Sequence, residues 1–168
     1  MLAAVAIGLV VPWMTPVSFG LHAPGWHVGR SGTYYESVGN AHTRTPTSTA
    51  WAANVRCPDC GRSNPPNATL QHFPELGIIV RAYIEPPDST GWPPAGRRLT
   101  GTYSLADASH LPCCEAARIA GGSWELYGFG PKRSYGVIVD VYWGSQPTTA
   151  MRAAAQRAIR SLRLPQPR

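Results

Sequence analysis

Two cysteines in the stretch RCPDCG, residues 56–61, have the types and spacing most suited to chemistry. Cys57 and Cys60 are separated by two residues, so their thiols could bind a metal ion, form a disulfide or exchange electrons with another thiol pair. The other two cysteines of the chain, Cys113 and Cys114, are adjacent in sequence. These four residues form the first candidate site.

Catalysis of thiol–disulfide exchange is the least favoured of the three possibilities. Enzymes of that kind place the cysteine pair at the amino terminus of a helix, where the helix dipole stabilises the thiolate. Here Gly61 and the pair Pro65 and Pro66 follow Cys60, so a helix cannot begin at the required place.

Zinc binding is better motivated and is the alternative prediction. Cys-Pro-Asp-Cys-Gly has the form of a zinc knuckle, and a tetrahedral site needs four nitrogen or sulfur ligands. His110 and Cys113 offer a second pair at chelating spacing, which gives the ligand set Cys57, Cys60, His110 and Cys113. The stretch HLPCC is not itself a knuckle, however, and adjacent cysteines rarely direct both sulfurs at one ion.

Disulfide formation is the favoured prediction for Cys57, Cys60, Cys113 and Cys114. An even number of cysteines in an oxidising compartment usually forms pairs, and four cysteines allow three pairings. Two bonds from Cys57 and Cys60 to the other two cysteines would tie one loop to another. Each would stabilise the domain by about 2–4 kcal/mol, because the loops closed are long.

No other stretch carries a convincing catalytic motif. The segment 29–33 falls one residue short of a Gly-x-Ser-x-Gly elbow, and the glycines of 128–136 lack the Gly-Lys-Ser/Thr of a phosphate loop. Asp140 lies within an apolar strand pattern and is expected to pair with an arginine. Trp92, in the loop STGWPPAG, is a candidate binding anchor. No catalytic residue is predicted, and no cofactor apart from the alternative zinc ion.

The amino-terminal segment 1–23 suggests a location. An uninterrupted apolar run over 2–11 is typical of a secretory signal, although no positive charge precedes it. An uncleaved membrane anchor is the second interpretation, but Pro12 and Pro16 interrupt the segment. A buried element of the domain itself is the third. The prediction is a secreted or cell-envelope protein.

The charge of the chain is positive without being clustered in sequence. The 168 residues fit one domain and carry a formal net charge of +6, contributed by arginine because Lys132 is the only lysine. The arginines occur singly or in pairs, whereas a nucleic-acid footprint should cluster on one face. Nucleic acid is therefore an unlikely partner in this interpretation; an envelope partner is expected, and a membrane if the amino-terminal segment is retained.

Patterning predicts an α+β fold that is rich in loops. The segment 24–47 is expected to be irregular, 48–164 to form a single α+β domain, and 165–168 to be a tail. Patterning predicts a mostly antiparallel sheet of about five strands, at 48–57, 77–85, 97–105, 123–129 and 134–144. Dense Ile, Val and Tyr indicate the strand at 77–85, and a moderate alternation indicates the one at 97–105. Apolar residues at helical spacing predict a carboxyl-terminal helix packed on this sheet, with Thr148 as its cap.

The last third of the chain resembles a family of small uncharacterised exported proteins from actinobacteria. The stretches GGSWELYGFGP and SYGVIVDVYWGSQPTTAMRAAAQRAIRSL carry the resemblance, together with the opening Gly25-Trp26-His27. It covers about half of the chain and includes no motif of known chemistry. The resemblance implies an exported protein that ends in a strand, a turn and a helix.

The leading functional prediction is a small exported or membrane-tethered domain that binds a ligand or has a structural role. It would be stabilised by disulfides and non-catalytic. The alternative is an intracellular module stabilised by zinc on Cys57, Cys60, His110 and Cys113, in contact with nucleic acid through its arginines. A hydrolase that uses scattered carboxylates or histidines is the least supported.

Overall fold

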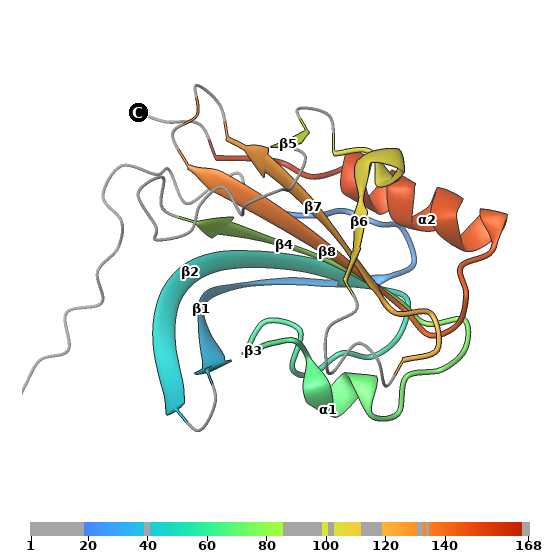
Figure 1. Cartoon of the computed structure of the whole chain (residues 1–168), viewed down its shortest axis with the longest axis horizontal. Helices are drawn as coiled ribbons and strands as arrows, with labels where there is room; N and C mark the ends of the chain where they lie inside the picture. The colour runs from blue at the N-terminus through green and yellow to red at the C-terminus, as the bar shows by residue number, and fades with distance from the viewer. Residues whose placement is uncertain are drawn as a thin grey trace, which may run out of the picture.

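The computed structural model describes residues 19–38, 41–85, 99–100, 103–111, 119–130, 133 and 135–165 (Figure 1). In chain order the elements are β1 (His27–Val38), β2 (Ala41–Ala53), β3 (Ser63–Asn64), α1 (Asn67–Leu70), β4 (Ile78–Glu85), β5 (Leu99–Thr100), the 3-10 turn η1 (Leu105–Asp107), β6 (Ser109–Leu111), β7 (Ser123–Phe129), β8 (Gly136–Trp143) and α2 (Thr149–Arg160).

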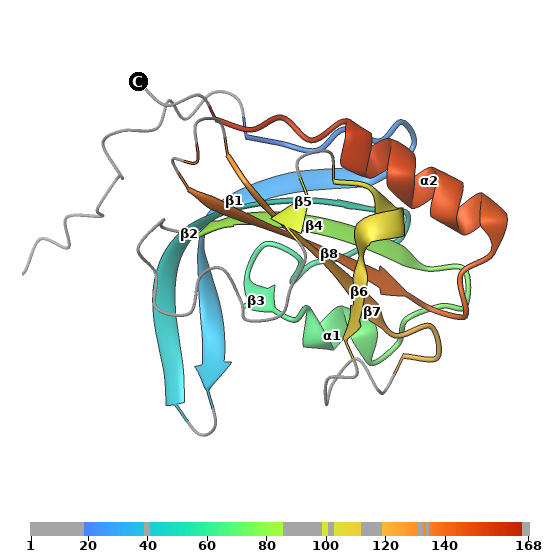
Figure 2. The ribbon, with the colours of Figure 1, turned by 45° about the horizontal axis from the view of Figure 1, so that its top comes forward.

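All strands of the described part belong to one sheet, in the order β3-β1-β2-β4-β8-β7-β5, with β6 also paired to β7. The pairings from β1 through β2, β4 and β8 to β7 and β6 are antiparallel, and only the two-residue strands β3 and β5 join in parallel. In Figures 1 and 2, α2 crosses one face of the sheet and α1 lies on the side away from it. The predicted α+β fold is confirmed.

The predicted irregular segment 24–47 is wrong. It contains β1 and the first half of β2, which pair along an antiparallel register from His27 opposite Ala53 to Val38 opposite Ala41. Glycine and serine suggested a loop, but the pairing of two neighbouring strands outweighs local propensity. A threonine at every second position from Thr43 to Thr49 is the strand signal that the composition concealed.

The boundary predicted at residue 23 is also wrong, because the domain already includes residue 19. Phe19, Leu21 and Ala23 are buried in the main core, while Gly20 and His22 between them are not. This alternation with a period of two is that of an extended segment with one buried side. Gly20 forms an antiparallel bridge with Arg163, beyond the end of α2.

The predicted strand over 97–105 is represented by only two described strand residues, those of β5. The strands predicted over 77–85, 123–129 and 134–144 are observed as β4, β7 and β8. Dense Val and Ile are decisive in the last strand, since every residue of β8 is buried.

The main core lies between the sheet and α2. Val80, Val139 and Val141 are fully buried on this face and belong to the same cluster as Ile159 of α2. The predicted cap is confirmed, since the Thr148 hydroxyl accepts a hydrogen bond from the Met151 N–H at 3.2 Å. Within the described ranges, no helix has the length and apolar character needed to cross a bilayer.

Candidate functional site

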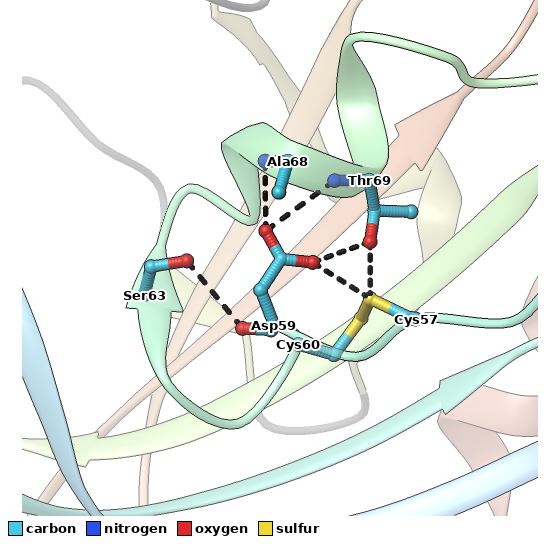
Figure 3. Close-up of a disulfide and its surroundings, with 6 residues drawn as sticks. All are labelled: Cys57, Asp59, Cys60, Ser63, Ala68 and Thr69. Atoms are coloured by element: carbon cyan, nitrogen blue, oxygen red, sulfur yellow. Dashed lines mark hydrogen bonds between the residues drawn. A yellow bond between two sulfur atoms is a disulfide. The ribbon is translucent and has the colours of Figure 1, made fainter.

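Cys57 and Cys60 are joined to each other by a disulfide, with their Cα atoms 5.4 Å apart (Figure 3). The bond therefore closes the RCPDCG loop on itself, and the expected connection of these two cysteines to Cys113 and Cys114 is not the one observed. Cys113 and Cys114 lie outside the described residues. Because the closed loop is so short, its entropic stabilisation is about 2 kcal/mol, at the low end of the predicted range.

Asp59, between the two cysteines, organises the loop and the helical turn that follows it (Figure 3). Its carboxylate accepts hydrogen bonds from the N–H groups of Ala68 at 2.8 Å and Thr69 at 3.3 Å, and from the Thr69 hydroxyl. Its backbone carbonyl accepts from the N–H groups of Arg62 and Ser63. Asp59 thus binds amide groups at the start of α1 that no cap residue satisfies, since Pro66 has no side-chain donor or acceptor.

The disulfide is buried and is not placed to exchange with an external thiol. Cys57 is 4% and Cys60 0% exposed, and both pack with Leu70, Ile79 and Tyr142 in a second core cluster. An attacking thiolate must reach a sulfur atom, so burial of both sulfurs opposes exchange. The arrangement is that of a structural crosslink.

His110 does not lie with these cysteines. It is exposed on β6 and pairs with Trp124, which packs against the main core on the α2 side of the sheet. The disulfide packs on the other face, against Ile79 and Tyr142. The structure therefore does not bring together the described members of the zinc set; Cys113 lies outside the described residues. Among the residues that the structure describes, no three His, Cys, Asp or Glu side chains are grouped as metal ligands would be.

A layer of polar side chains occupies the sheet face opposite α2. Successive strand residues alternate between the two faces of a sheet. The valines of β4 and β8 point toward α2, so the residues between them in sequence lie on the opposite face. The members, called here the polar layer, are Arg81, Tyr83, Glu125, Tyr127, Asp140 and Tyr142. Arg81 is 1% and Asp140 2% exposed, which is unusual for charged residues.

The predicted arginine partner of Asp140 is Arg81, which lies directly opposite it in the β4–β8 pairing. Burial raises the pKa of Asp140 to about 6, while the charge of Arg81 and a hydrogen bond from the Tyr142 hydroxyl act to lower it. That hydroxyl donates to Oδ2 at 3.5 Å, whereas the buried Oδ1 atom has no hydrogen-bond partner in the structure described.

Two tyrosines of the layer, Tyr83 and Tyr142, remain neutral. Burial raises the pKa of Tyr83 and of Tyr142 well above the usual value, and the nearby charge of Asp140 adds to the effect. A carboxyl group enclosed in this way can hold a proton near neutral pH. This carboxyl group is enclosed and has no direct access to a substrate in solution. Its protonation therefore affects the stability of the fold.

Most of the exposed charged side chains among the described residues are basic. Glu75 is the one exposed carboxylate among them, whereas eight arginines are exposed: Arg30, Arg56, Arg62, Arg133, Arg152, Arg157, Arg160 and Arg163. Their scatter in sequence concealed a cluster, since the last four belong to α2 or directly follow it. The signal that could have found it is the lack of any carboxylate after Asp140. Trp92, the predicted binding anchor, lies outside the described residues.

Comparison with protein-family models, with curated proteins and with solved structures finds no match. The functional argument therefore depends on the geometry of the chain itself.

Proposed function

We propose that this chain is a small exported or membrane-tethered domain that acts by binding, without catalysis, and is stabilised by the Cys57–Cys60 disulfide. The observation that carries the proposal is this buried disulfide. Disulfides persist in secreted and envelope proteins and are rare where thiol reductants are abundant. The partner belongs to the cell envelope.

The amino-terminal sequence supports the same location. The apolar run over 2–11 precedes Phe19, the first buried residue in the part of the chain that the structure describes. A secretory signal is removed ahead of the folded domain, so cleavage would have to occur before residue 19 to keep the core complete. Retention of the segment would leave a tethered domain instead.

The distribution of polar groups supports binding over catalysis. Asp140 and its partner Arg81 are enclosed, and both sulfurs of the disulfide are buried. Among the described residues, the charged groups presented to solvent are mainly guanidinium groups, which suit contact with anionic partners.

The test is expression of the full chain in an actinobacterial host, followed by separation of culture medium, envelope and cytoplasm. We expect the protein in the medium or the envelope, with Cys57 and Cys60 protected from alkylation until a reductant is added. Recovery of the chain only from the cytoplasm, with both thiols reduced, would contradict the proposal. A stoichiometric zinc ion on that cytoplasmic protein would favour the zinc-stabilised module.

A further inference from the structure

We propose that the outward side of the carboxyl-terminal half of α2 is a contact surface for an anionic membrane. Three exposed residues form this surface, called here the arginine face: Arg157, Arg160 and Arg163. The inference rests on the proposed envelope location and names the partner of that domain as the headgroups of anionic phospholipid.

The orientation of α2 fixes where these side chains lie. Met151, Ala155, Ala158 and Ile159 are the buried residues of the helix. Arg157 and Arg160 are three positions apart, so they are neighbours on the helix surface, and both are exposed. Arg163 continues the same chain just after the helix and is exposed as well.

The charged side chains of the segment that carries the arginine face are all positive. The chain contains no Asp or Glu after Asp140. The neighbouring turn η1 contacts α2, since the Leu105 N–H donates a hydrogen bond to Gln156 Oε1 at 2.8 Å. This turn carries the carboxylate Asp107, which is half-buried. The arginine face is thus complementary to a surface of phosphate groups, which guanidinium binds with two parallel hydrogen bonds.

The path of the amino terminus points to a membrane and not to another anion. The Gly20 N–H donates to the Arg163 carbonyl at 3.2 Å, and the Arg163 N–H donates to the Gly20 carbonyl at 2.9 Å. The His22 N–H adds a bond to Ser161 Oγ at 2.7 Å. Figure 2 shows this blue segment beside the red chain that follows α2. The apolar sequence before residue 19 therefore joins the domain next to the arginine face.

The two features act together. Where the apolar segment is retained, it would enter the bilayer, and basic residues at its junction with the domain would add attraction to anionic headgroups. Each Arg close to an anionic surface strengthens binding about fivefold at physiological salt. Where the apolar segment is retained, a nucleic acid would use the arginines but would give that adjacent segment no binding partner.

The experiment measures flotation of the full chain with vesicles of phosphatidylcholine alone and of phosphatidylcholine mixed with phosphatidylglycerol. We expect binding to be at least about tenfold tighter on the anionic vesicles, and this preference to weaken at high salt. The variant Arg157→Gln/Arg160→Gln should lose about 25-fold of the preference, and Arg157→Lys/Arg160→Lys should retain most of it.

The matched control is Arg56→Gln/Arg62→Gln, which removes the same charge from two exposed arginines beside the disulfide loop. It should keep the preference for anionic vesicles, and thermal unfolding of each variant verifies that the domain is intact. Equal losses in both double variants, or no loss in the first, would overturn the proposal. So would binding to duplex DNA that depends on Arg157 and Arg160 and is tighter than binding to vesicles.

These outcomes are separate from the fate of the proposed function. An exported, disulfide-bonded chain that ignores lipid charge would refute the arginine face alone. A cytoplasmic, reduced chain that still prefers anionic vesicles through Arg157 and Arg160 would refute export while retaining the surface.

Discussion

The two faces of the sheet are built from the same strands but are stabilised in different ways. On the side of α2, valines of β4 and β8 pack against Ile159 and its neighbours, and the contact is apolar. On the opposite side the same strands present Arg81 and Asp140, both buried. An apolar face needs only shape and area, whereas a buried charge needs a specific partner. The first face therefore tolerates conservative change and the second depends on pairing.

Removal of one charge from the polar layer should have the largest effect. The variant Arg81→Met leaves the Asp140 carboxylate buried without its opposing charge, and we expect a loss of about 3–5 kcal/mol in the free energy of unfolding. Urea denaturation measures it. The double variant Arg81→Met/Asp140→Leu should recover most of this loss, because no uncompensated charge remains. A double variant as unstable as the single one would show that the two residues are not coupled.

Truncation on the apolar face should cost somewhat less. Ile159 is 2% exposed within the main core, and Ile159→Ala should reduce stability by about 2–4 kcal/mol through lost burial and the cavity left behind. The matched change Ile159→Val should cost about 1 kcal/mol. Equal costs for the two variants in urea denaturation would mean that the contact between α2 and the sheet is loosely packed.

The polar layer should also make stability depend on pH. Asp140 has its pKa raised from 3.8 to about 6, so the native state binds the proton more tightly than the unfolded chain. This contribution is fully present below about pH 4 and is lost as the pH rises through about 6, on the order of 2–3 kcal/mol.

The measurement is urea denaturation between pH 4 and pH 7, with Asp140→Asn as the control. Asparagine cannot ionise, so this variant should lack the part of the slope due to Asp140. The remaining charged groups facing Asp140 are Arg81 and Glu125, and they stay in the variant. An identical slope in both proteins would assign the pH dependence to other groups.

Asp59 offers the smallest of the four effects. The variant Asp59→Ala removes the acceptor for the N–H groups of Ala68 and Thr69 and should lower stability by about 2 kcal/mol. Hydrogen exchange of these two amides should rise more than that of β8. If their protection were unchanged, the loop would be held by the disulfide and not by the carboxylate.

The elements dense in Val and Ile were predictable because burial on both faces leaves a continuous apolar pattern, as in β4 and β8. The helix α2 and its Thr148 cap were predictable because both are local in sequence. The hairpin of β1 and β2 was not, since its stability comes from pairing between strands of polar composition. The buried residues Phe19, Leu21 and Ala23 have the sequence character of a leader, because they continue the preceding apolar run.

The candidate sites divide in the same way. The cysteine spacing indicated a disulfide, but its pairing is a matter of three-dimensional distance. The role of Asp59 depends on a contact with α1, and the pairing of Arg81 with Asp140 depends on the register of two strands distant in sequence. The arginine face is local in sequence, but its proximity to the amino-terminal segment depends on the fold, which brings residue 20 beside residue 163.

The most direct test of the account is a tryptic map of the exported protein without reduction, after alkylation of free thiols. Cleavage after Arg56 and Arg62 releases the peptide 57–62, which contains both cysteines of the loop, while Cys113 and Cys114 fall in the separate peptide 99–118. The account predicts a free 57–62 peptide with an internal disulfide and no alkylation. A 57–62 peptide that is alkylated on both cysteines, or that is crosslinked to 99–118, would contradict it.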